Sequence, residues 1–257
     1  MKIAITGKGG VGKTTISALL CHIFSTEGKK VIAVDADPDA NLAAALGVSK
    51  EELNSIRPIA DMSDLIEERT GVRPGTSGGI FKLNPKVDDI PEGFGFKIGN
   101  ITLLIMGKSK AAASGCYCPE SALLKRLLKH LVLERDEVII VDMEAGIEHL
   151  TRGTTGGVDA FIVVVEPGQR SLQTALTVKR LSEELGIRRV FVIANKIRNE
   201  TDLEFINNSL DDMELLGHMS FNNDIMESDI RGLPSFEASQ EVVEEAVRIK
   251  TKLENLI

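Results

Sequence analysis

The amino-acid sequence predicts a doubly wound α/β fold with a mostly parallel sheet. Short apolar runs alternate with longer amphipathic stretches along the 257 residues. The runs are nearly continuous and rich in β-branched residues, which is typical of strands buried on both faces. Amphipathic stretches between such strands are expected to be crossover helices, as in other doubly wound folds.

The expected strands are Lys2–Thr6, Lys30–Asp35, Ile101–Met106, Glu137–Asp142, Ala160–Val165 and Arg189–Ala194. Between them, apolar residues recur at helical spacing in Ile16–Phe24 and Leu172–Leu185, and a glycine follows each stretch where a helix would end. Phe94–Ile98, followed by a Gly-Asn pair and the run from Ile101, predicts a hairpin. This hairpin would add one antiparallel edge strand.

We expect a single domain over residues 1–257. Residues 50–92 are rich in proline and glycine, with a predicted helix at Ala60–Thr70, and are expected to form an ordered excursion, not a second domain. The amphipathic stretch Ser239–Leu256 is expected to pack on the sheet as a helix. Its polar face is too acidic for a helix that binds a membrane surface.

Composition restricts the possible partners. A net charge of −8 opposes nonspecific DNA binding, and the lack of tryptophan opposes stacking on single strands. There is no apolar stretch long enough to cross a bilayer, and there is no signal-peptide pattern at the start. With only three cysteines, a disulfide framework is not expected either. We therefore expect a cytoplasmic protein without nucleic-acid or membrane partners.

The segment Gly7–Thr14 reads GKGGVGKT and has the features of a phosphate-binding loop. It directly follows the first strand and opens the first helix, so backbone N–H groups and the helix end would face the β-phosphate. Lys13 would neutralise the β- and γ-phosphates, and the Thr14 hydroxyl would ligate Mg²⁺. The residues expected to bind nucleotide are Gly7, Lys8, Gly9, Gly10, Val11, Gly12, Lys13, Thr14, Thr15 and Asn195.

Lys8 is a second lysine, near the start of this loop. With it, the segment KGGVGKT resembles the deviant Walker A family, which includes nitrogenase iron protein, the arsenite-pump ATPase and the MinD and ParA ATPases. The resemblance implies a P-loop NTPase of the SIMIBI class that works as a homodimer. It also implies that Lys8 reaches the partner's nucleotide and stabilises transition-state charge there, as an arginine finger does.

A carboxylate-rich segment, Asp35–Asn41, follows the second strand. Asp35 and Asp37 alternate along the chain, so an extended backbone would place them on the same side. This segment resembles the switch I of the family. The resemblance implies that Asp37 orients or deprotonates the attacking water and that Asp35 supports Mg²⁺ through water. For Asp39 and Asn41, the alternative is that one of them caps the following helix.

The strand that ends at Asp142 is followed by a turn at Gly146. Asp142 is the Walker B candidate for the Mg²⁺ shell, and the segment resembles switch II, whose glycine lets the loop respond to the γ-phosphate. His149 lies nearby in the sequence with two glutamates. We expect His149 to be an interface or hydrogen-bonding residue and not a metal ligand.

Asn195 and Lys196 follow the valine-rich strand, where this fold reads the nucleotide base. GTPases have N-K-x-D at this place, but here the fourth residue is Arg198. The difference favours ATP, and the family resemblance implies that Asn195 contacts adenine. The alternative is that Asn195 only forms a turn.

Cys116 and Cys118 are separated by one residue, and Pro119 with Glu120 suits the first turn of a helix. A helix N-terminus would stabilise the thiolate of Cys118, which suits a soft metal ion. Two thiolates are too few for a metal site, but two chains would supply four, enough for tetrahedral Zn²⁺ or square-planar Ni²⁺. The alternatives are burial as small apolar residues, a strained disulfide across one residue, and a chance occurrence of the two cysteines.

The Cys116–Cys118 pair and the segment DMEAGIEHL, Asp142–Leu150, resemble those of the nickel-insertion accessory ATPases of carbon monoxide dehydrogenase, the CooC type. This resemblance implies an ATP- and Mg²⁺-dependent homodimer that hydrolyses ATP to ADP and phosphate and shares Ni²⁺ or Zn²⁺ between subunits. The client would be a nickel-containing carbon monoxide dehydrogenase. The alternatives are an iron–sulfur redox ATPase like nitrogenase iron protein, which has well-separated single cysteines, and a positioning ATPase like MinD or ParA, which the acidic charge opposes.

Overall fold

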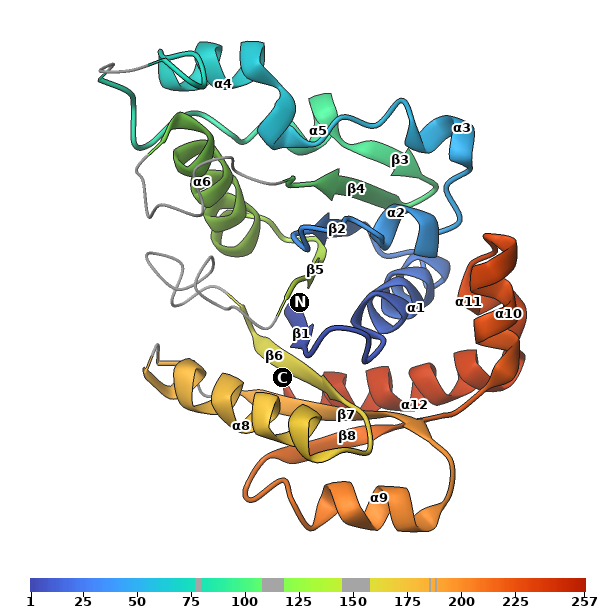
Figure 1. Ribbon diagram of the computed structural model, residues 1–257. Coiled ribbons are helices and arrows are strands. Elements are labelled where there is room, and N and C mark those ends of the chain that lie inside the picture. The colour runs from blue at the N-terminus through green and yellow to red at the C-terminus, as the bar shows by residue number, and fades with distance from the viewer. Residues whose placement is uncertain (77–79, 108–117, 145–157, 185, 188) are drawn as a thin grey trace.

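The computed structural model describes residues 1–257 except 77–79, 108–117, 145–157, 185 and 188. The strands of the described chain form one sheet in the order β3-β4-β2-β5-β1-β6-β7-β8 (Figure 1). They are β1 Lys2–Gly7, β2 Val31–Asp35, β3 Phe96–Ile98, β4 Ile101–Ile105, β5 Val138–Asp142, β6 Ala160–Val165, β7 Val190–Ile197 and β8 Glu214–Ser220. Only the β3–β4 pair is antiparallel among these neighbours. The predicted fold class and the antiparallel edge strand are thus confirmed.

Helices cover both faces of the sheet. The helical elements among the described residues are α1 Lys13–Thr26, α2 Leu42–Ala45, α3 Lys50–Leu53, η1 Ile59–Asp61, α4 Ser63–Thr70, α5 Ile90–Phe94, α6 Pro119–Glu134, α8 Gln169–Glu184, α9 Glu200–Asn207, α10 Asn223–Arg231, α11 Ser235–Ala238 and α12 Gln240–Leu256. In Figure 1, α1 and α12 lie on one side of the sheet, and α6 and α8 lie on the other. The helix expected at Ala60–Thr70 is instead a 3₁₀ turn followed by α4, and α4 packs beside α6.

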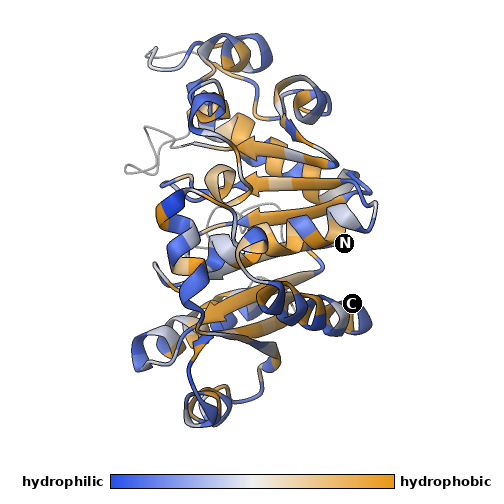
Figure 2. Cartoon of the chain, turned by 90° about the vertical axis from the view of Figure 1, so that its right-hand side faces the viewer, coloured by the Kyte–Doolittle hydropathy of each residue, from blue (hydrophilic) through white to orange (hydrophobic). Residues whose placement is uncertain are grey.

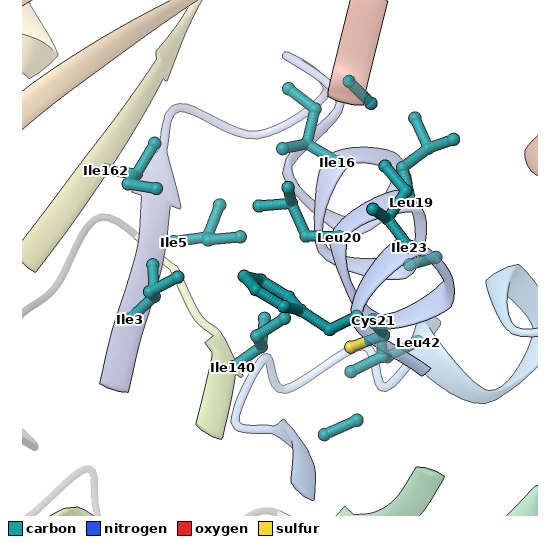
Figure 3. Packing of buried hydrophobic residues seen from close by; sticks show 14 of the residues in the cluster. Ile3, Ile5, Ile16, Leu19, Leu20, Cys21, Ile23, Leu42, Ile140 and Ile162 are labelled. Carbon is teal, nitrogen blue, oxygen red and sulfur yellow. The ribbon is translucent and has the colours of Figure 1, made fainter. Parts of the chain in front are cut away.

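Alternate residues of the strands enter two separate cores, one on each face. On β1, for example, Ile3 and Ile5 face α1 and α12, whereas Ala4 belongs to the cluster that includes α6 and α8. Figure 3 shows apolar side chains of α1, with Cys21 among them, packed toward Ile3 and Ile5. Figure 2 shows the strands as apolar along their length. Burial on both faces explains the continuous apolar runs in the sequence.

The strand β8 was not predicted from the sequence. Its segment, ELLGHMS, contains no β-branched residue and is only partly buried, so it lacks the signal that marked the other strands. Gly217 lets α12 approach this strand closely, because a Cβ atom at Gly217 would lie 2.8 Å from the Ile249 side chain. The expectation that Ser239–Leu256 packs on the sheet is therefore confirmed.

A buried carboxylate joins α12 to the end of β8. Glu245 is 4% exposed, and its carboxylate accepts hydrogen bonds from the Ser220 backbone N–H at 2.9 Å and from the Ser220 hydroxyl at 2.6 Å. A buried charge is tolerated only when such partners replace its hydration. Glu245 therefore holds the end of β8, at Ser220, against α12.

No described helix has both the length and the apolar character needed to cross a membrane.

We predict that Glu245→Ala lowers the free energy of unfolding by about 2 kcal/mol, because it leaves the part-buried Ser220 N–H without its charged acceptor. Glu244→Ala, at an exposed position of the same helix, is the matched control and should change stability by less than about 0.5 kcal/mol. Urea unfolding of the three proteins measures this difference. Equal losses in the two variants would contradict the role of Glu245.

Candidate functional site

The candidate site lies where β1, β5 and β2 end side by side. Asp142, the last residue of β5, is paired with Ile5 of β1 and with Asp35 of β2. Parallel strands bring their carboxyl ends to one edge of the sheet, so the loop after β1 meets both carboxylates there. Segments more than a hundred residues apart in the sequence thus form one site.

The phosphate-binding loop depends on two glycines in the left-handed region. Gly10 has φ 81° and Gly12 has φ 96°, a conformation that other residues adopt only with strain. Gly12 is also the N-cap residue of α1. A Cβ atom at Gly12 would lie 2.2 Å from the Asn195 Nδ2 atom. Both the backbone conformation and the available space therefore require glycine at this position.

The two residues expected to act on the γ-phosphate and on water lie together. Lys13 is 6% exposed, and its Nζ atom lies 3.7 Å from the Asp37 carboxylate. Asp37 also accepts a hydrogen bond from the Asp39 backbone N–H at 3.0 Å, which holds its side chain in place. Lys8 and Thr15 are half-exposed members of the same loop and helix start.

Thr14 and Asp142 form the predicted magnesium-binding pair. The Thr14 hydroxyl donates to Asp142 Oδ2 at 2.7 Å, and Asp142 has no solvent exposure. In the described chain, its other oxygen, Oδ1, is buried without a hydrogen-bond partner. Burial raises the pKa of Asp142, against the lowering effect of Thr14 and of the Lys13 charge. A hydroxyl and an unsatisfied carboxylate oxygen fit Mg²⁺, which prefers oxygen ligands.

The Asp35 side chain holds the segment that follows β2 through hydrogen bonds to its backbone N–H groups. Its carboxylate is buried and accepts hydrogen bonds from the N–H groups of Leu42 at 2.9 Å and Asp37 at 3.2 Å. Burial raises the pKa of Asp35 to about 7; the Leu42 hydrogen bond opposes this shift and the Asp142 charge adds to it. Asn41 occupies the N-cap position of α2 without a side-chain capping bond. The alternative that Asn41 caps this helix is therefore wrong, because the Asp35 carboxylate accepts the hydrogen bond from the Leu42 N–H.

Asn195 binds the phosphate loop, a contact that was not predicted from the sequence. Its Nδ2 atom donates to the Val11 carbonyl at 2.7 Å, and its Oδ1 atom accepts from the Lys196 backbone N–H at 2.9 Å. The amide therefore joins the end of β7 to the loop after β1. The contact of Asn195 with adenine stays a prediction.

Cys118 lies at the N-terminus of α6, as predicted. It is the N-cap residue, and its sulfur accepts from the Ser121 backbone N–H at 3.4 Å. Cys116, Gly146 and His149 lie outside the described residues. Within the described ranges, no group of three or more His, Cys, Asp or Glu side chains is arranged around a metal position. Cys21 is fully buried, and burial raises the pKa of its thiol far above the usual range.

Comparison with known proteins identifies the family. The model of the CobQ/CobB/MinD/ParA nucleotide binding domain matches residues 2–236. The chain is 49% identical over 239 residues to the carbon monoxide dehydrogenase accessory protein CooC of Rhodospirillum rubrum, covering 93% of this chain and 90% of that protein. An uncharacterized ATP-binding protein of Methanocaldococcus jannaschii is 51% identical over 237 residues, with 91% and 90% covered.

Solved structures show the same fold at lower identity. MinD cell division protein of Aquifex aeolicus has a TM-score of 0.68 at 22% identity, covering 99% of this chain and 97% of that one. A ParA family ATPase from Chlorobium tepidum has a TM-score of 0.72 at 17% identity, with 98% and 97% covered. These structures confirm the predicted P-loop NTPase fold. Together with the family match over residues 2–236, they confirm the SIMIBI class and the resemblance to the deviant Walker A ATPases. The chain is a P-loop ATPase and belongs to the CobQ/CobB/MinD/ParA nucleotide-binding family.

Proposed function

We propose that this chain is a maturation factor that hydrolyses ATP, dimerises with bound nucleotide and assists nickel insertion into carbon monoxide dehydrogenase. The observation that carries the proposal is the 49% identity to CooC over nearly the whole chain. The Cys118 position at the start of α6 adds support, because sulfur is a ligand that soft metal ions prefer. We place this activity in the cytoplasm, without nucleic-acid or membrane partners.

Each residue of the phosphate site has a role that its geometry supports. The loop from Gly7 to Thr14 would hold the phosphates by its N–H groups, and the buried Lys13 would neutralise their charge. Thr14 and Asp142 would hold Mg²⁺, which neutralises phosphate charge when bound. Asp37, in contact with Lys13 at 3.7 Å, would accept a proton from the attacking water. Asp35 would support this arrangement by holding the switch backbone.

Lys8 is the residue that makes a dimer part of the mechanism. It is only half-buried and lies next to the exposed Gly9 and Gly10, so this part of the loop is accessible to a second chain. By the family resemblance, each Lys8 would act on the nucleotide of the other chain. Nucleotide would then stabilise the dimer, because the phosphates of each nucleotide would attract Lys13 of their own chain and Lys8 of the other chain.

The same dimer would complete a metal site. Cys116 and Cys118 from two chains would supply four thiolates, and nickel would be the cargo of this site. Zinc as a structural clasp is the alternative occupant with the same ligands. ATP binding and hydrolysis would bring the two pairs of cysteines together and separate them.

We predict that Lys8→Ala abolishes ATP hydrolysis but leaves ADP binding nearly unchanged, and that Asp37→Asn also abolishes hydrolysis. When the two inactive variants are mixed in equal amounts, about a quarter of the wild-type turnover should return, because about half of the dimers are mixed and each has one complete site. Phosphate release measures turnover. Lys29→Ala, at an exposed lysine, is the control and should keep full activity. A mixture that stays inactive would contradict action of Lys8 on the partner's nucleotide.

We predict that Cys116→Ala and Cys118→Ala each abolish nickel and zinc binding, because each change removes two of the four thiolates of a dimer. Cys21→Ala is the matched control, since the buried Cys21 thiol is held protonated, and it should bind metal as the wild type does. Elemental analysis of the nucleotide-bound proteins gives the metal content per chain. Unchanged metal content in either variant would contradict the shared site.

A further inference from the structure

Lys196 connects the phosphate loop to two neighbouring strands. Its Nζ atom donates to the Gly10 carbonyl at 2.6 Å and pairs with the Glu166 carboxylate at 2.9 Å. Lys196 belongs to the end of β7, and Glu166 directly follows β6. The ammonium therefore joins the loop after β1 to the carboxyl ends of the next two strands in the sheet. No role of this lysine was predicted from the sequence.

The backbone at Lys196 has an uncommon conformation that directs its side chain. Lys196 has φ 59°, in the left-handed region that residues other than glycine adopt at a cost. The pairing of β7 with β8 is irregular here, with a register shift between Ala194 and Ile197. The Asn195 side chain accepts the Lys196 N–H at 2.9 Å and stabilises the turn. Strained backbone of this kind persists where the surroundings hold it, often at functional sites.

The contacts of Lys196 and Asn195 determine how two peptide groups of the loop are turned. Lys196 holds the Gly10 carbonyl, and Asn195 holds the next carbonyl, that of Val11. In a planar trans peptide, the N–H points away from the C=O. Fixing these two carbonyls on the β7 side therefore turns the Val11 and Gly12 N–H groups away from β7. The Val11 N–H donates to the Lys8 carbonyl within the loop at 3.4 Å, and the Gly12 N–H is the one that this arrangement directs toward an anion. Phosphate loops bind anions through N–H groups turned in this way.

We propose that Lys196, held by Glu166, is a positioning residue that keeps the phosphate loop in its anion-binding conformation before nucleotide binds. The inference rests on the nucleotide site of the proposed function and adds a residue to it. A loop that is already ordered loses less conformational freedom on binding, which increases affinity. The Lys196–Glu166 pair is partly exposed, with side chains 41% and 29% exposed, so it adds little to global stability. The effect of removing it should appear in phosphate binding.

The test compares a ligand that has a base with one that has none. Lys196→Met keeps an unbranched side chain of similar size but removes the ammonium group, and Lys196→Arg keeps the positive charge. We expect Lys196→Met to raise the Kd of both MgATP and inorganic tripolyphosphate about tenfold, the loss typical of a charged hydrogen bond. Lys196→Arg should restore most of the affinity, and Glu166→Gln should weaken both ligands to a smaller extent. Displacement of a fluorescent ADP analogue from the full chain measures both Kd values for the wild type and for each variant.

Two controls separate positioning from other roles. Lys29→Met, at an exposed lysine, should leave both Kd values unchanged, and Lys196→Met should have the wild-type melting temperature without ligand. Weaker binding of MgATP alone would mean that Lys196 contacts the base and would overturn the inference. A lower melting temperature in Lys196→Met, or unchanged Kd values, would also overturn it. Failure of the wild type to bind nucleotide would instead contradict the proposed function.

Discussion

The pairing of β5 between β1 and β2 is the constraint on which the whole site depends. It places Asp142 beside Asp35 and within hydrogen-bond distance of Thr14, although the three residues are far apart in the sequence. The register is held by burial on both faces, since alternate residues of each strand enter different cores. A slip of one residue would exchange the two faces of β5 and move Asp142 away from the loop. Packing of the sheet therefore determines the chemistry at its edge.

The edge of the sheet concentrates negative charge where the metal ion of a bound nucleotide would bring positive charge. Asp35 and Asp142 are buried side by side, and burial raises the pKa of both. Lys13 offsets part of this charge, and the backbone N–H groups around Asp35 offset another part. The unsatisfied oxygen of Asp142 is the remaining polar group. A divalent cation would coordinate this oxygen and offset the charge of the two carboxylates. The Mg²⁺ of bound MgATP would therefore stabilise this edge of the sheet.

The parts of this arrangement that follow from local sequence could be predicted. The central strands have continuous β-branched runs, the phosphate loop has a fixed spacing, and carboxylates at strand ends meet at one edge. Cys118 was also placed correctly, because Pro119 and a leucine stripe mark the start of α6. Each of these signals lies within a few residues of the chain.

The remaining parts depend on contacts between distant segments. Asn195 and Lys196 hold carbonyls of a loop that lies more than 180 residues away in the sequence, and the left-handed backbone of Lys196 has no sequence signal like that of glycine. Asp35, at the end of β2, takes the capping role considered for Asn41, because its carboxylate accepts the Leu42 N–H at the start of α2. The edge strand β8 contains no β-branched residue. It is stabilised by packing of α12, which can approach closely because Gly217 has no side chain.

Native mass spectrometry of the wild type with Mg²⁺, a non-hydrolysable ATP analogue and Ni²⁺ is the most direct measurement of whether two chains share one site. We expect a species with the mass of two chains, two nucleotides and a single nickel ion, and we expect it to dissociate when ADP replaces the analogue. A monomer that carries its own nickel ion, or a nucleotide-bound dimer without metal, would contradict a metal site shared between subunits.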